Sequence, residues 1–350
     1  MAIIDKPTEY FDTRTYSASG SGSVSDVGFQ PDFLWFKNRT IVGDHGLMDA
    51  IRGVNKILHS NDNNAEVTSG ASNDFTAFTS NGFTYGTSAQ LDTSSGTPCT
   101  WLWKANGAGS SNTDGSITST VSANTTSGFS IVSYTGTGSN ATIGHGLGSA
   151  PQVVLLKERN GTNNWLMSHQ PLSASLGDYT RFMTLNSTGA VSGAGNVVFQ
   201  GSAFTSSVFN VGTSVGSNGS SQTYIAYCFA EKQGYSKFGL YTGNGNADGK
   251  FVYTGFKPAF VMCKITSGTD NWILMDNKRL GYNASNYQLI PNSTLADQTP
   301  ERIDLLSNGF KTRSTNGEVN GSGSSYIFMA FAENPFVTST TTGSIPATAR

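Results

Sequence analysis

Four histidines are the first residues in this chain that could support catalysis or bind a metal ion: His45, His59, His145 and His169. None is paired with Cys, Asp or Glu at the spacing of a common metal motif. In the internal repeat described below, His45 and His169 align with Trp and Asp. Positions that vary between such unlike residues are poor candidates for a shared centre, so we predict neither a metal site nor a catalytic site from them.

Two short motifs resemble functional loops. Gly212-Thr-Ser214-Val-Gly216 matches the nucleophile elbow of α/β hydrolases, but that motif requires a strand, a helix and a downstream His. Asn244-Gly-Asn246-Ala-Asp248-Gly249 is similar to a calcium loop, yet the twelfth position is Gly255 where a Glu is needed. We interpret the first as a chance match and the second as a Gly/Asn turn.

Charged pairs and tryptophans remain as candidates for binding. Asp49 with Arg52, and Asp276 with Arg279, could bind a carboxylate or a sugar, or form salt bridges within each copy that fix a turn. Among the tryptophans, Trp35, Trp101 and Trp103 lie in apolar runs typical of a core. Trp165 and Trp272 follow polar Asn-rich turns, so we predict that they are exposed and are the candidate surface-binding residues.

An internal repeat organises all of these residues. Tyr134-Thr-Gly-Thr-Gly138 matches Tyr241-Thr-Gly-Asn-Gly245 at an offset that also relates Asn164-Trp165 to Asn271-Trp272. A third copy precedes these two. Three landmarks recur: a Pro-led apolar run ending in Lys, an Asn-Gly-Phe turn and an aromatic closing strand. The apolar runs are Pro31-Asp-Phe-Leu-Trp-Phe-Lys37, Pro151-Gln-Val-Val-Leu-Leu-Lys157 and Pro258-Ala-Phe-Val-Met-Cys-Lys264.

These landmarks predict a fold made of strands. A nearly continuous apolar run indicates a central strand covered on both faces, with its Lys emerging into solvent. Asn-Gly before Phe predicts a tight turn. Gly, Ser, Thr and Asn fill most gaps between runs, as turns require. Sustained helical periodicity is lacking, and we allow one short helix over Leu47 to Leu58.

The predicted fold class is therefore all-β, with three tandem antiparallel β-sandwich (jelly-roll-like) domains of about 100 residues each. The boundaries place the sandwich repeats at 1–105, 127–233 and 234–336. Residues 106–126 are predicted to be a Gly/Ser/Asn/Thr linker, and 337–350 an extended C-terminal tail.

Composition limits the partners and the location. The net charge of −2 and the lack of a basic cluster argue against nucleic-acid binding. No apolar stretch is long enough to span a membrane, and the first residues do not resemble a signal peptide. Cys99, Cys228 and Cys263 have no CxxC spacing, so we predict buried thiols in a protein made in a reducing compartment. No cofactor is expected.

Several segments resemble a repeat of unassigned function in virion proteins of marine tailed bacteriophages. They include Lys6-Pro-Thr-Glu-Tyr-Phe11, Gly128-Phe-Ser-Ile-Val-Ser-Tyr-Thr-Gly-Thr-Gly138, Gly144-His-Gly-Leu-Gly148 and the ending from Phe331-Ala-Glu-Asn-Pro-Phe336 to Ala349-Arg350. The resemblance covers nearly the whole chain and brings no catalytic residues. It implies a tail, tail-fibre or other surface component of a virion.

The expected function is accordingly that of a non-enzymatic virion structural protein at the tail or tail-fibre surface, which contacts the host. Self-association, with a homotrimer favoured, and other virion proteins are the expected partners, and the expected location is the virion, assembled in the host cytoplasm. The alternatives are an array of glycan-binding modules recognising host-surface carbohydrate, or a capsid decoration protein.

Overall fold

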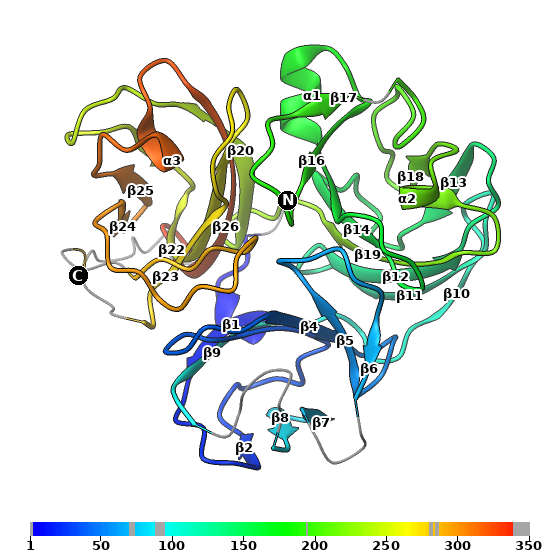
Figure 1. Ribbon diagram of the computed structural model, residues 1–350, viewed down its shortest axis with the longest axis horizontal. Helices are drawn as coiled ribbons and strands as arrows, with labels where there is room; N and C mark the ends of the chain where they lie inside the picture. Colours follow the sequence, from blue (N-terminus) through cyan, green and yellow to red (C-terminus); the bar gives the residue numbers. More distant parts are fainter. Residues whose placement is uncertain are drawn as a thin grey trace.

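The computed structural model describes residues 3–69, 74–87, 95–193, 195–279, 283 and 287–338. Viewed down its shortest axis, the molecule has three lobes around a common centre, one for each copy of the repeat (Figure 1). Nearly all the regular structure is antiparallel strand, which confirms the all-β class. Most of the predicted C-terminal tail lies outside the described residues, which end at Thr338.

Copy 1 consists of a large sheet and a small sheet. The large sheet, in spatial order, contains β1 (Phe11–Thr15), β9 (Pro98–Trp103), β3 (Phe33–Asn38), β4 (His45–Asp49), β5 (Lys56–His59) and β6 (Val67–Thr68). The small sheet contains β2 (Gly22–Val24), β8 (Gly82–Tyr85) and β7 (Phe75–Thr79).

Copy 2 repeats this order and adds two strands at one edge. Its large sheet contains β10 (Ser110–Asn112), β11 (Ser119–Asn124), β12 (Phe129–Thr135), β19 (Thr223–Phe229), β14 (Val153–Glu158), β15 (Leu166–His169), β16 (Arg181–Thr184) and β17 (Ser192–Gly193). Its small sheet contains β13 (Ala141–Gly144) and β18 (Val208–Val211).

Copy 3 has the same core order in a shorter sheet. Its large sheet contains β20 (Ser236–Thr242), β26 (Ser325–Pro335), β22 (Phe256–Ile265) and β23 (Ile273–Asp276). Its small sheet contains β21 (Phe251–Tyr253), β25 (Gly309–Thr312) and β24 (Ile303–Leu306).

The segment predicted as a linker, 106–126, is not one. It forms β10 and β11, and β11 pairs with β12 over six residues of the second large sheet. The Ser- and Thr-rich segment carries no strand signal of its own, because β11 is stabilised by its pairing with β12 and not by apolar residues of its own. Copy 2 therefore begins before residue 127.

The helix allowed over Leu47 to Leu58 is also wrong. This stretch is the β4–β5 hairpin, and its turn requires left-handed backbone at Gly53 (φ 84°) and Asn55 (φ 65°), which a helix could not contain. The described helices are instead short elements between strands: η1 (Pro7–Glu9), α1 (Gln170–Leu176), α2 (Val215–Asn218) and α3 (Gly317–Asn320).

The central strand of each copy is covered on both faces, as its apolar run predicts. In β3, Leu34 and Phe36 face the small sheet of copy 1, while Phe33 and Trp35 face the other two copies. The strands β14 and β22 alternate in the same way. Each copy thus has a core of its own, and all three contribute to a fourth core that they share.

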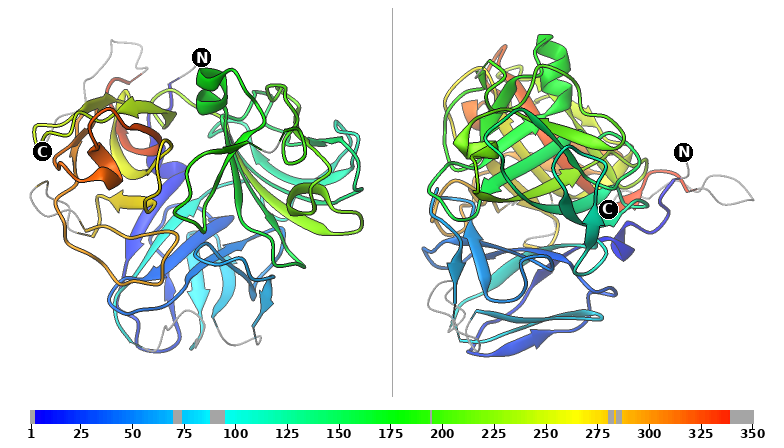
Figure 2. Two further views of the ribbon diagram at one scale, coloured as in Figure 1. Left: turned by 45° about the horizontal axis from the view of Figure 1, so that its top comes forward. Right: turned by 90° about the vertical axis from the view of Figure 1, so that its right-hand side faces the viewer.

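Three matched aromatic residues mark the centre of this shared core. Trp103 and Phe229 end the strands β9 and β19, and Phe331 holds the equivalent position within β26, which continues to Pro335. Their ring centroids lie 6.3 Å (Trp103–Phe229), 5.7 Å (Phe229–Phe331) and 5.4 Å (Trp103–Phe331) apart. The copies are therefore related by an approximate threefold axis within one chain. The three lobes remain distinct when the molecule is turned by 45° (Figure 2, left).

The lysine that ends each apolar run does not emerge into solvent as predicted. Lys37, Lys157 and Lys264 are fully buried. Each Nζ donates to nearby backbone carbonyls, for example Lys37 Nζ to Asn38 O (2.9 Å) and Ile41 O (3.0 Å). Burial lowers the pKa of each of these amines to about 8. The lysine therefore fixes the turn after the central strand from inside the fold.

Candidate functional site

Trp165 and Trp272, predicted to be exposed, are buried, with 0% and 1% of their surface accessible. Each closes a contact between two copies. Trp165 Nε1 donates to the carbonyl of His59 in copy 1 (2.7 Å), and Trp272 Nε1 donates to that of Thr184 in copy 2 (3.0 Å). The polar turns before these residues suggested solvent, but they face a neighbouring copy instead. The prediction of a surface-binding pair is wrong.

The equivalent position in copy 1 is His45, which lies at the third contact, between copy 1 and copy 3. It is buried, its Nδ1 accepts from Trp35 Nε1 (3.0 Å), and its pKa is lowered by burial, so the imidazole is neutral. The carbonyl of Ile290 in copy 3 lies beside it and acts against this shift. We call the three contact zones junction 1/2, junction 2/3 and junction 3/1, after the copies that meet there.

Junction 1/2 contains a buried ionic cluster. The Asp49–Arg52 ion pair receives a hydrogen bond from Tyr227 Oη of copy 2 to Asp49 Oδ2 (2.8 Å). Arg52 also contacts Glu66 (3.3 Å), which pairs with Arg159 of copy 2 (Nε–Oε2, 2.9 Å). Burial alone would lower the pKa of Arg52, but Asp49, Tyr227 and Glu66 raise it, so the guanidinium remains charged.

Junction 3/1 repeats this cluster residue by residue. Arg279 Nε donates to Asp276 Oδ2 (2.7 Å), which also accepts from Trp101 Nε1 of copy 1 (3.1 Å). Arg279 binds Asp297 (2.6 Å), and Asp297 lies 3.3 Å from Arg39 of copy 1. The salt-bridge interpretation of these pairs is thus supported, with one addition: each pair also joins two copies.

Junction 2/3 has the same backbone but different side chains. His169 and Leu172 replace the Asp and Arg. His169 Nε2 contacts the carbonyl of Phe328 (3.3 Å), and burial lowers its pKa to about 4. The residue opposite is Met329, which has no donor for a carboxylate, whereas Tyr227 and Trp101 both have one. Copy 2 therefore lacks the Asp–Arg pair at the junction where copy 3 presents Met329, which could not donate a hydrogen bond to the Asp.

A backbone hydrogen bond crosses each junction at matched positions and shows that the three are equivalent. The donors and acceptors are Glu66 N to Arg159 O (2.7 Å), Val191 N to Thr266 O (3.0 Å) and Asp297 N to Arg39 O (2.7 Å). In junction 2/3, which has no ionic cluster, Val191 occupies the position of Glu66 and Asp297, and Thr266 occupies the position of Arg159 and Arg39. The inner pairs Asp49–Arg52 and Asp276–Arg279 have no exposed side-chain surface, while the outer Arg159 and Arg39 side chains are 22% and 19% exposed. The clusters hold the copies together, and their inner ion pairs are not accessible to a substrate.

The two short motifs also have structural roles. Ser214 Oγ caps the one-turn helix α2 by accepting from Gly216 N (3.2 Å). In the calcium-like loop, Asn244 Oδ1 and Asn246 Oδ1 accept from backbone amides two residues onward, at 3.0 and 2.9 Å, and Asp248 pairs with Lys311. The turn interpretation is supported for this loop.

A solvent-open groove of about 760 Å³ lies between copies 2 and 3. At its rim the Tyr253 side chain is 59% exposed. Its polar lining includes Gln152 and the Glu231–Lys237 ion pair (2.7 Å). An exposed ring beside hydrogen-bonding groups is the arrangement that binds the apolar face of a sugar.

Sequence reasoning missed Tyr253 because it looked for the same residue in every copy. Val252 pairs with Phe310 as Val24 pairs with Phe83 and Ile143 with Phe209. The positions equivalent to Tyr253 are therefore Ser25 and Gly144, as the aligned strands show. An aromatic residue where the other copies have Ser and Gly is the signal that could have identified it.

None of the helices in the described part of the chain is long and apolar enough to cross a membrane.

Comparison with known proteins identifies the family without assigning an activity. No curated protein matches the sequence. One family model matches residues 6–335, nearly the whole chain. The chain therefore belongs to the family described as Domain of unknown function (DUF7483).

Proposed function

We propose that the protein is a non-enzymatic structural component of a bacteriophage virion, located at the tail or tail-fibre surface. The observation that carries the proposal is the closed ring of three junctions. Matched polar residues that could do chemistry, such as Asp49, Asp276 and His169, are buried between copies and bond to groups of the neighbouring copy. The bacteriophage assignment rests on the sequence resemblance.

The ring also bears on self-association. The apolar faces through which three single-copy chains would form a trimer are covered within this one chain. A homotrimer of the whole chain, which we retain as part of the proposal, would need other surfaces: the outer loops, or the two ends of the pseudo-threefold axis. In either case the chain supplies three lobes around an approximate threefold axis.

The test is to look for the protein in particles. Mass spectrometry of density-purified virions should recover this chain in stoichiometric amounts with known structural proteins. Immunogold labelling should place it on the tail and not on the capsid, where a decoration protein would lie. Light scattering on the purified chain gives its assembly state. Absence from virions would contradict the proposal whatever the assembly state.

The groove supports a second candidate function, the binding of host-surface glycan. This form of the hypothesis needs one site in one groove, instead of the array of modules that the sequence suggested. Tyr253 would stack on a sugar ring while Gln152, Glu231 and Lys237 bind its hydroxyls. The ring of Tyr253 is accessible without any rearrangement, which favours a preformed site.

We expect Tyr253→Ala to weaken binding of any glycan identified on an array by about tenfold or more, equivalent to ~1.4 kcal/mol. Tyr253→Phe should keep most of the affinity because the stacking face remains. Phe251→Ala is the matched control, since Phe251 is 40% exposed on the same strand but does not line the groove. Equal losses in the Tyr253→Ala and Phe251→Ala variants would contradict a specific stacking site.

A further inference from the structure

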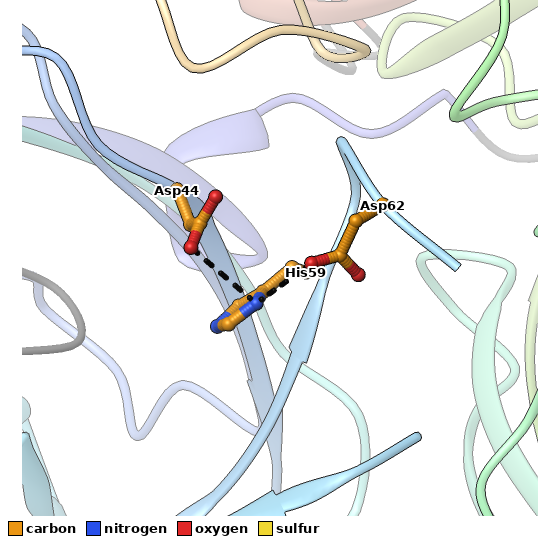
Figure 3. Close-up of side chains that lie close together, drawn as sticks. All are labelled: Asp44, His59 and Asp62. Carbon is orange, nitrogen blue, oxygen red and sulfur yellow. Dashed lines mark hydrogen bonds and ion pairs between the residues drawn. The ribbon is translucent and has the colours of Figure 1, made fainter. Parts of the chain in front are cut away.

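The loop before β4, the end of β5 and the loop that follows β5 bring Asp44, His59 and Asp62 together at the edge of junction 1/2. His59 Nδ1 lies 3.7 Å from Asp44 Oδ2 and 3.3 Å from Asp62 Oδ2. The imidazole lies between the two carboxylates, and both contacts end on the same ring nitrogen (Figure 3). His59 is buried, while the two aspartates are partly exposed, so the cluster is open to solvent on the carboxylate side.

Asp44 has one oxygen more than its structural role requires. Its Oδ1 accepts from Asn61 Nδ2 (2.7 Å). The same bond forms in the other copies, where the acceptors are the amide oxygens of Asn164 and Asn271, each at 2.9 Å from the matched Asn. An amide is therefore sufficient for the turn. The second oxygen of Asp44 is directed at His59 and has no counterpart with charge in copies 2 and 3.

Asp62 shows the same excess. Its Oδ1 accepts from Asn64 N (2.9 Å). At the equivalent positions Ser187 and Ser293 do this with a hydroxyl, at 3.1 and 3.3 Å. The second oxygen of Asp62 faces His59 and is held in place by Asn64 Nδ2 (2.8 Å). This outer bond orients the carboxylate as bonds around metal ligands do.

His59 completes the difference between the copies. His59 lies opposite Gly46 on the neighbouring strand. The equivalent residues are Thr184 in copy 2, opposite Leu166, and Ile290 in copy 3, opposite Ile273. In all three copies the backbone carbonyl at this position faces the neighbouring copy: those of His59 and Thr184 accept from the buried indoles, and that of Ile290 lies beside His45. Three positions, two in loops and one at the end of β5, thus change together in copy 1, and each adds one metal-ligating atom that has no counterpart in copies 2 and 3.

The spacing of these atoms suits a small divalent ion. Ligand atoms bound tetrahedrally at about 2.0–2.1 Å lie about 3.3–3.4 Å apart. The separation of His59 Nδ1 from Asp62 Oδ2, to which it is hydrogen-bonded, is 3.3 Å and matches this value. The separation from Asp44 Oδ2 is longer, at 3.7 Å, and all the ligand atoms lie within 4.8 Å of one another. One imidazole and two carboxylates are donors that Zn²⁺ accepts, whereas Ca²⁺ needs six or more oxygens.

We propose that copy 1 binds one Zn²⁺ ion through His59 Nδ1, Asp44 and Asp62, with water completing the coordination. This proposal departs from the sequence-based interpretation of the histidines, which compared positions shared by all copies and so could not detect a centre built in one. Bound metal would fix the Asp62 loop, whose Asn63 Nδ2 donates to Thr162 O of copy 2 (2.9 Å). Zn²⁺ should therefore stabilise junction 1/2.

The test uses the full chain, without a histidine tag, after treatment with a chelator. Isothermal titration with ZnCl₂ should give one site per chain, and Zn²⁺ should raise the melting temperature. Replacing the ligands with the residues of copy 2, Asp44→Asn, His59→Thr and Asp62→Ser, should each weaken binding at least tenfold. Because these residues serve the same turns in copy 2, the melting temperature without metal should stay close to that of the original protein.

Asp270→Asn is the matched control, because Asp270 precedes the equivalent Asn–Trp pair in copy 3 and has no histidine beside it. This variant should bind Zn²⁺ as the original chain does. The proposal is overturned if Zn²⁺ neither binds nor shifts the melting temperature at millimolar concentration. It is equally overturned if the three ligand variants bind like the Asp270→Asn variant, or if Ca²⁺ binds and Zn²⁺ does not.

Discussion

A Trp103→Ala variant is expected to lose about 3–5 kcal/mol of its free energy of unfolding, and to lose it from all three copies together. Trp103 belongs to copy 1, yet its ring packs against Phe229 of copy 2 and against Phe260 and Phe331 of copy 3. The indole is 2% exposed, so its removal leaves a cavity at the point where the copies meet. No single copy can repair that cavity alone.

Scanning calorimetry is the measurement, combined with hydrogen exchange. We expect one transition with matching calorimetric and van't Hoff enthalpies, shifted to lower temperature in the variant. Amides of β14 and β22 should lose protection even though the change lies in β9. Val42→Ala is the control, since Val42 is 68% exposed and its truncation should change stability by less than about 0.5 kcal/mol. Separate transitions, with loss of protection confined to copy 1, would show that the repeats are independent domains.

The fold class could be read from the sequence because its evidence is local. The apolar run ending in Lys37 is recognisable without knowing what covers it, and the Asn-Gly-Phe turn before β8 fixes its own geometry. The repeat then carries each such conclusion to the other copies. That is why the strands and the double coverage of β3, β14 and β22 were predictable.

The contacts between copies could not be read in this way. Whether Trp165 meets water or the carbonyl of His59 depends on a residue 106 positions away, and no local pattern records it. The strand β11 was mistaken for a linker for the same reason, since its partner β12 supplies the hydrogen bonds. The comparison of copies did contain one usable signal: Asp49 and Arg52 vary together with the residue they face.

That covariation predicts the effect of mutating junction 1/2. Arg52→Leu is expected to cost about 3–5 kcal/mol of the free energy of unfolding, because Asp49 would remain buried without its cation. Exposed pairs behave differently. Arg181→Leu, which removes an ion pair whose side chains are 38% and 32% exposed, should cost less than about 1 kcal/mol and serves as the control.

The stronger test is to transplant one junction into another. Junction 2/3 has the same backbone arrangement as junction 1/2 but side chains that form no ion pairs. The residues of junction 2/3 can therefore be placed in junction 1/2 as a group. The five substitutions are Asp49→His, Arg52→Leu, Glu66→Val, Arg159→Thr and Tyr227→Met. Buried ion pairs are often replaced by packed apolar residues with little loss, or with a gain of 1–4 kcal/mol.

We therefore expect the five-residue variant to recover most or all of the stability that Arg52→Leu loses, as measured by urea unfolding at neutral pH. Partial sets should be worse than the full set, because any carboxylate left without Arg52 or Tyr227 remains buried and unpaired. If the full set is as unstable as the single variant, each junction is shaped for its own residues and the three are not interchangeable. Recovery would show that the ionic clusters select which copies pair, while the shared core around Trp103, Phe229 and Phe331 supplies the stability of the ring.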